Sequence, residues 1–245
     1  MAAVEQPGTP AASGAASSPS NSARAAISAN SVKAVNSVKA EMAQRPAAAL
    51  TRKGELTRAR ITAAASTAIA SHGVAASTID EVRSLAGVSS SQLYHYFADK
   101  DDLVRAVIDL RADLAVDATA RAWSSLSSIA DLRAWRDQLI AGVEADGCRG
   151  GCPLGSLSGQ LAETDPDARA DLAEAFRRWQ LAMQAGLKSM QARGILAADA
   201  DAHRLSTAML VALEGGLMFA QLERTTRALA IGLDTAIDVV EGYVV

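Results

Sequence analysis

The chain has 245 residues, of which 49% are hydrophobic and 4% aromatic, and its formal net charge at pH 7 is −3. Alanine and leucine dominate while β-branched strand formers are sparse, so the composition favours an all-α fold. The acidic net charge argues against a generally basic nucleic-acid coat, so any DNA contact must be local.

Two further features point to the compartment. The only cysteines are Cys148 and Cys152, too few for a secreted domain built on disulfides. The N-terminus lacks the apolar core of a signal peptide, and no apolar run approaches the roughly 20 residues of a membrane span. We therefore expect a soluble cytoplasmic protein without a membrane segment.

Residues 1–53 consist mainly of alanine, serine, proline and asparagine, with few large apolar side chains. Such a segment cannot bury enough surface to offset the entropy of ordering, so we predict a disordered tail. The tail is basic, and two interpretations stay open: it keeps the chain soluble, or Arg52 and Lys53 touch phosphates or a minor groove as an arm. Its basic residues are Arg24, Lys33, Lys39, Arg45, Arg52 and Lys53.

Residues 54–102 carry the pattern of a three-helix DNA-binding domain. Ile61, Ala65 and Ile69 recur at helical spacing, and Gly73 supplies the stop of a first helix. Three helix starts follow in quick succession. Each begins with a capping residue and has a carboxylate or amide three residues later: Thr78 with Glu81, Ser89 with Gln92, and Asp99 with Asp102.

Between the first two of these starts, one helix can end at Gly87 and the next begin at Ser89. This is the pattern of a helix-turn-helix. Apolar side chains on the first short helix can pack against Leu93 and Phe97 on the second, with the earlier helix beneath them. Those apolar residues are Ile79, Val82 and Ala86.

The second short helix leaves a polar surface that contains no carboxylate, which suits a major groove. Gln92 is suited to bidentate reading of adenine, and Tyr94 and Lys100 to holding the backbone. This helix has no lysine or arginine, so phosphate attraction must come from Lys100, Arg58 and Arg83, with the basic tail as a further candidate source. The candidate DNA-contacting residues are Arg58, Thr78, Ser89, Ser90, Ser91, Gln92, Tyr94, His95 and Lys100.

Residues 55–105 resemble the TetR family signature. The matching strings are Thr78-Ile79-Asp80-Glu81-Val82, Ala86-Gly87-Val88-Ser89, Leu93-Tyr94-His95-Tyr96-Phe97 and Lys100-Asp101-Asp102-Leu103. The resemblance implies an all-α homodimeric repressor without a cofactor, whose C-terminal domain binds a ligand and dimerises. It also implies DNA contacts from Thr78, Ser90, Gln92, Tyr94, His95 and Lys100. Arg83 departs from the family's usual small residue, and Ser91 from a frequent glycine.

Residues 103–245 form the predicted ligand-binding and dimerisation domain. One helix begins at Asp99, and a long one runs from Asp165-Pro166 to Gly194. Aromatic and methionine side chains here are candidates to line an apolar pocket for a small apolar or aromatic effector, or else to fill the core. The candidate pocket residues are Trp123, Trp135, Cys152, Phe176, Trp179, Met183 and Met209.

The segment Gly147–Leu157 is rich in glycine and contains both cysteines. Its Gly-Cys-Pro-x-Gly stretch resembles a branch of TetR-like regulators that includes LmrA and YxaF, which would imply a planar aromatic inducer. The two thiols are interpreted as buried and inert, as a redox switch, or as part of a soft-metal site. No histidine or carboxylate cluster completes a metal ligand set.

The last two helices are predicted to form the dimer interface, with two helices from each subunit making a four-helix contact. The alternative is that the same faces pack within one chain. The residues assigned to the interface are Leu205, Met209, Leu213, Gly216, Leu217, Leu229, Leu233 and Ile237.

Together these patterns predict a sequence-specific DNA-binding regulator of double-stranded operator DNA. An enzyme is disfavoured because His72, His95 and His203 lie far apart, and no nucleophile motif or phosphate loop is present. An interaction module that has lost DNA binding and an architectural protein with weak sequence preference remain as alternatives.

Overall fold

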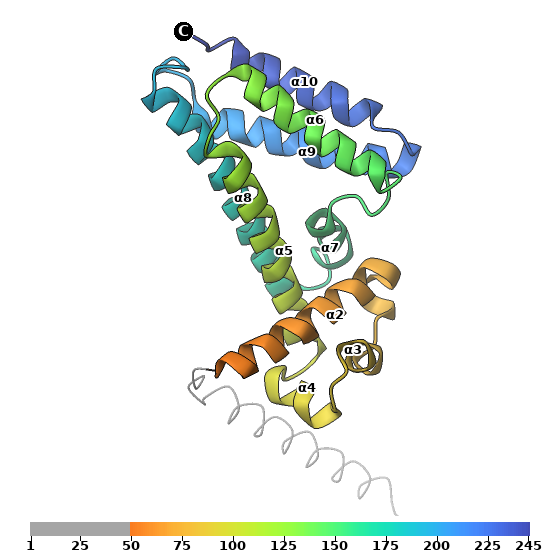
Figure 1. The fold of residues 1–245 in the computed structure, drawn as a ribbon. Helices are drawn as coiled ribbons and strands as arrows, with labels where there is room; N and C mark the ends of the chain where they lie inside the picture. Colours follow the sequence, from red (N-terminus) through yellow and green to blue (C-terminus); the bar gives the residue numbers. More distant parts are fainter. Residues whose placement is uncertain (1–49) are drawn as a thin grey trace, which may run out of the picture. The chain divides into compact units, whose positions relative to one another are not determined.

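The computed structural model describes residues 50–245, and the elements named within this range are α-helices (Figure 1). They are α2 (Arg52–Ala76), α3 (Ile79–Ala86), α4 (Ser90–Tyr96), α5 (Lys100–Trp123), α6 (Ile129–Ala145), α7 (Pro153–Leu161), α8 (Pro166–Ala192), α9 (Ala202–Glu223) and α10 (Arg227–Glu241). The predicted tail lies outside the described residues except at its end, where Arg52 and Lys53 belong to the first turn of α2. Helix formation therefore starts earlier than position 54.

Helices α2, α3 and α4 form the predicted three-helix unit. Gly73 interrupts α2 with a φ of 79°, and Gly87 ends α3 in the left-handed conformation with a φ of 62°. Both positions favour glycine because a Cβ is strained there. Ile61 of α2, Val82 of α3 and Leu93 of α4 are at most 3% exposed, so the three helices share a core, which continues into the rest of the described part.

Helices α5 and α8 pack against each other and connect the three-helix unit to α6, α9 and α10 at the other end of the described part (Figure 1). Trp123 of α5 is fully buried, and an ideal Cβ on Gly186 of α8 would lie 2.9 Å from the Trp123 Cβ. The absence of a side chain at Gly186 therefore allows Trp123 to pack directly against α8. Pro166 and Gly194 delimit α8 as expected, with Asp165 as its N-cap.

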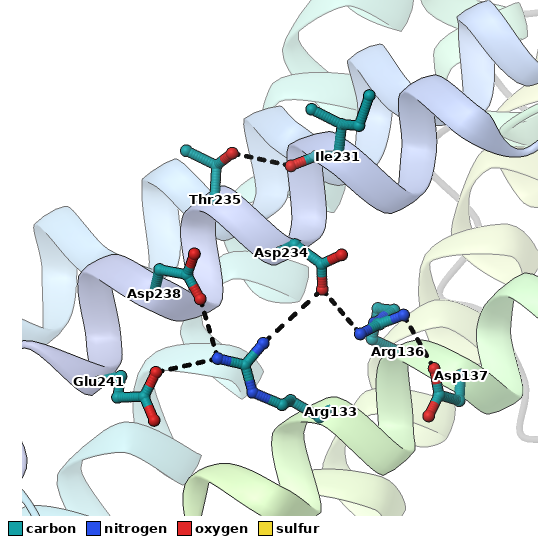
Figure 2. A network of polar contacts seen from close by, with 8 residues as sticks. All are labelled: Arg133, Arg136, Asp137, Ile231, Asp234, Thr235, Asp238 and Glu241. Atoms are coloured by element: carbon teal, nitrogen blue, oxygen red, sulfur yellow. Dashed lines mark hydrogen bonds and ion pairs between the residues drawn. The ribbon is translucent and has the colours of Figure 1, made fainter.

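A network of ion pairs joins α6 to α10 (Figure 2). Arg133 contacts Asp238 at 2.8 Å and Glu241 at 2.9 Å, while Arg136 contacts Asp234 at 2.7 Å. These pairs are partly solvated, so each contributes little to stability. Their geometry nevertheless fixes how α6 lies along α10.

The C-terminal helices correct the predicted dimer interface. Leu205, Met209, Leu213, Leu229, Leu233 and Ile237 are at most 4% exposed within a single protomer, Gly216 is buried, and Leu217 is half-buried. An ideal Cβ on Gly216 would lie 2.7 Å from the Leu229 Cα, so this face serves the close contact between α9 and α10. A partner chain cannot reach side chains buried in this way.

Helix α9 combines length with an apolar composition, although Glu214 interrupts its apolar run. Among residues 50–245 it is the one helix long and apolar enough to cross a membrane by length and composition. Core helices of soluble proteins pass the same test, and Met209 and Leu213 of α9 are almost fully buried against neighbouring helices.

Candidate nucleic-acid interface

Helix α4 is positioned by a complete capping box. The Gln92 N–H donates to the Ser89 side chain at 3.2 Å, and the Gln92 Oε1 accepts from the Ser89 N–H at 3.0 Å. Leu93 and Phe97 anchor the other side of the helix in the core. The cap and the anchor together determine which side chains of α4 point outward.

The outward side chains are the polar set that the sequence predicts. Ser89, Ser90, Ser91, Gln92 and His95 are exposed, and Tyr94 is 49% exposed. The His95 and Tyr96 rings meet edge to face with centroids 4.9 Å apart, and Tyr96 is half-buried, which orients the imidazole beside the core. This surface offers hydroxyl, amide and imidazole groups and no carboxylate.

The capping box uses the same amide oxygen that Gln92 would need to read adenine. Bidentate reading of adenine needs the amide oxygen as an acceptor and the amide nitrogen as a donor. In this structure the Oε1 already accepts the Ser89 N–H. The Oε1 has a second lone pair, so Gln92 keeps an acceptor site and its Nε2 donors for a base while the cap is intact.

Two of the basic candidates are held against the three-helix core. The Arg58 guanidinium carbon lies 5.1 Å from the centroid of the Phe97 ring, a cation–π contact. The Lys100 ammonium donates to the Ala75 carbonyl at 3.3 Å, near the end of α2. Each cation retains further N–H donors for phosphate.

The α3 start differs from its predicted capping box. Thr78 accepts the Glu81 N–H at 3.2 Å as expected. The Glu81 carboxylate instead meets His72 Nε2 at 3.2 Å, which ties α3 to the end of α2. Arg83 pairs with Asp80 at 3.4 Å and is half-buried, in keeping with a surface side chain. Thr78 is exposed, and the cap uses its hydroxyl as an acceptor and not as a donor.

Comparisons with known proteins agree with this geometry. A family model described as "Bacterial regulatory proteins, tetR family" matches residues 61–107, and one described as "Tetracyclin repressor-like, C-terminal domain" matches residues 128–235. The transcriptional regulator AcuR of Cereibacter sphaeroides is 31% identical over 147 residues, covering 59% of this chain and 67% of AcuR. The chain belongs to the TetR family.

Solved structures of TetR-family proteins share the fold. A TetR regulatory protein from Rhodobacter sphaeroides has a TM-score of 0.64 and 27% identity, covering 75% of this chain and 98% of that one. A TetR regulator from Chloroflexus aurantiacus has a TM-score of 0.62 and 22% identity, covering 79% and 98% respectively. The protein is thus an all-α transcriptional regulator with the family's two domains.

The predicted effector-pocket residues of this TetR-family protein mostly fill the core. Trp123, Met183 and Met209 are fully buried, and Trp179 and Cys152 are at most 9% exposed. The Trp179 Nε1 donates to Thr119 at 2.7 Å, and Phe176 stacks on Trp179. Trp135 meets Trp123 edge to face and lines an open polar cleft between α5 and α6. The structure therefore gathers these residues mainly as packing.

A polar residue of α9 that sequence reasoning missed lies beside the cysteine segment. Burial and the nearby Glu214 raise the pKa of the Cys152 thiol to about 12, and burial raises the pKa of the Glu214 carboxyl. The Glu214 Oε1 is buried without a hydrogen-bond partner. The sequence feature that could have revealed this buried carboxyl is the single glutamate within the apolar pattern of α9. Among residues 50–245, no group of three or more metal-binding side chains is present.

Proposed function

We propose that this TetR-family protein is a cytoplasmic homodimeric repressor that binds a palindromic operator and is released by a small apolar or aromatic effector. The observation that carries the proposal is the surface of α4, where exposed polar side chains without a carboxylate stand on a helix fixed by its cap and core. A surface of this kind fits the major groove, where such groups meet base edges and phosphates.

The homodimer is supported by an unpartnered apolar face on the two C-terminal helices. On α9, Val211, Met218 and Leu222 are between 52% and 70% exposed, and on α10 Ile231 and Val239 are 58% and 49% exposed. A patch of this kind on paired helices is typical of a symmetric interface. This face replaces the one that the sequence analysis assigned, because both faces of α9 are apolar.

Release by an effector requires a second conformation. A ligand lowers operator affinity only if it binds one conformer more tightly than the DNA-bound conformer. In the favoured conformer the two DNA-binding domains would be misplaced for the operator. Because the predicted pocket residues are packed together, the effector would bind a conformer in which some of these side chains have moved. The resemblance to the LmrA and YxaF branch supports an aromatic effector.

The test is selection of bound fragments from random DNA, followed by a gel shift with the protein's own promoter region. A palindrome with half-sites roughly 34–36 Å apart or slightly more, bound by a dimer, is the expected result. Binding that random competitor DNA removes equally well would instead indicate an architectural protein. A release screen with planar aromatic compounds then tests the effector class.

A further inference from the structure

One side chain of α7 forms a hydrogen bond with the DNA-binding domain. The Gln160 Oε1 accepts the Val74 N–H at 2.7 Å, across 86 positions of sequence. An ideal Cβ on Gly73 would lie 2.8 Å from that oxygen. Gly73 leaves the helical conformation with a φ of 79°, so the hydrogen-bond ladder of α2 is interrupted here and Gln160 supplies an acceptor.

The Gln160 amide is itself oriented. Its Nε2 donates to the Ser156 carbonyl at 3.1 Å and to the Ser156 hydroxyl at 3.2 Å, both one turn earlier on α7. With the nitrogen held on α7, the oxygen points at α2. The position of the α2 turn is therefore tied to the position of α7.

The start of α7 and the segment before it lie close to α9. An ideal Cβ on Gly155 would lie 2.7 Å from the Glu214 Oε2, and one on Gly151 would lie 2.5 Å from the Gln221 Oε1. Arg224 also donates to the Cys148 carbonyl at 2.8 Å. The glycines of the Gly-Cys-Pro-x-Gly segment thus let α9 side chains approach the start of α7 closely.

We propose that α7 is a strut between α9 and α2, and that Gln160 is the positioning residue that fixes the orientation of the DNA-binding domain. The proposal rests on the proposed homodimer, because α9 carries the proposed dimer face. In such a dimer the distance between the two DNA-binding domains depends on the contacts that link α9 to α7 and α7 to α2. The other connection, through α5, remains when Gln160 is changed.

The first experiment measures affinity for operators whose half-sites are separated by spacers of different length. The native protein should show a sharp optimum, with affinity falling about tenfold or more one base pair away, because spacing is a geometric constraint. In Gln160→Ala, the affinity at the best spacing should exceed the affinity one base pair away by less than about threefold. The affinity of this variant for a single half-site should equal that of the native protein. An unchanged spacing profile in Gln160→Ala would overturn the proposal.

Two variants separate positioning from general damage. Gln160→Glu keeps an acceptor oxygen for the Val74 N–H and should retain the sharp optimum. Gln138→Ala removes an exposed glutamine from α6 and should leave the profile native. If Gln160→Glu and Gln138→Ala broaden the profile as much as Gln160→Ala does, the Val74 contact is not what positions the domain.

A second measurement does not depend on operator binding. Spin labels at exposed Ser71 on α2 and exposed Thr207 on α9, in the full chain diluted with unlabelled protein, report the distance within one chain. The native distribution should be narrow and that of Gln160→Ala clearly broader. If the native protein binds no paired half-sites, the proposed function fails, and this distance distribution alone decides whether α7 is a strut.

Discussion

Arg58 of α2 lies over the ring of Phe97, the residue that ends α4, with 5.1 Å between the guanidinium carbon and the ring centroid. Phe97 is 1% exposed while Arg58 is exposed. The contact therefore joins a surface cation to the core residue that anchors the recognition helix. The contact places the charge of the guanidinium at a defined position beside α4.

Arg58→Ala is expected to weaken DNA binding equally for all sequences, because a phosphate contact carries no base information. The slope of log affinity against log salt should become shallower by about 1, one counterion fewer. Loss of the cation–π contact should lower the free energy of unfolding by roughly 0.5–1 kcal/mol. Titrations at several salt concentrations and denaturant unfolding measure the two effects.

Arg169→Ala, which removes an exposed arginine from α8, is the matched control and should change neither the salt slope nor sequence preference. If Arg58→Ala altered preference at one base position and left the slope native, Arg58 would be a base reader instead of a phosphate contact.

Gln92 variants can separate capping from DNA contact. Gln92→Ala removes half of the capping box and should lower the free energy of unfolding by about 1 kcal/mol. Gln92→Glu keeps an acceptor for the Ser89 N–H but places a carboxylate on the DNA-facing surface. It should unfold like the native protein and bind DNA far more weakly. Equal DNA affinity of the native and Gln92→Glu proteins would remove Gln92 from the interface.

The accuracy of sequence reasoning depended on how local the determining interactions are. The caps at Thr78, Ser89 and Asp99 were predictable because the cap and its N–H donor are three residues apart. The cap and the stop of α3 at Gly87 define the helix-turn-helix without any tertiary information. The predicted polar surface of α4 follows from these local rules.

The errors arose where two tertiary arrangements share one sequence pattern. Both faces of α9 are apolar, so helical periodicity alone cannot tell the face that packs on α10 from the one left exposed, as the contrast between Leu213 and Val211 shows. The bond from Gln160 to Val74 spans 86 positions, and nothing in the local sequence marks it.

The exposed face of α9 can be tested against its buried face. Val211→Lys combined with Leu222→Lys should convert the dimer to a monomer, since these side chains are 65% and 70% exposed in one protomer. The effect on monomer unfolding should stay within about 0.5 kcal/mol, as is usual for surface substitutions. Analytical ultracentrifugation measures the assembly, and operator affinity should fall with it.

Two controls accompany this double variant. Leu114→Lys changes an exposed leucine of α5 and should leave the assembly native. Met209→Ala, on the buried face of α9, should lower the free energy of unfolding by about 2–5 kcal/mol through a core cavity. A double lysine variant that unfolds instead of dissociating would show that Val211 and Leu222 belong to the core.

The Cys152 thiol should resist alkylation in the folded protein. With its pKa raised to about 12, the thiolate fraction at pH 8 is about one in ten thousand, and the thiolate is the reactive form. Iodoacetamide labelling followed by mass spectrometry should find Cys152 unmodified in native buffer and modified in urea. Rapid labelling in native buffer would revive the interpretation of the cysteines as a redox switch.

Glu214 should make stability depend on pH in a defined direction. Because burial raises the pKa of its carboxyl in the folded state, the folded protein holds this proton more tightly than the unfolded chain. The free energy of unfolding therefore falls as pH rises from the unfolded pKa, about 4.3, to the folded pKa. Below both values the carboxyl is neutral in both states and costs no stability through ionisation.

Glu214→Gln replaces this carboxyl with a neutral group of the same shape, so its stability should lack this component of the pH dependence. The free energy of unfolding of the variant minus that of the native protein should be larger at pH 8 than at pH 5. Denaturant unfolding at both pH values measures this difference. Glu174→Gln, at an exposed ion pair whose carboxyl pKa is lowered by Arg177, should show no such difference between pH 5 and pH 8, because a carboxyl with a lowered pKa changes stability only at or below about pH 4.3. Parallel pH profiles for native and Glu214→Gln proteins would mean that the Glu214 carboxyl titrates normally despite its unpartnered oxygen.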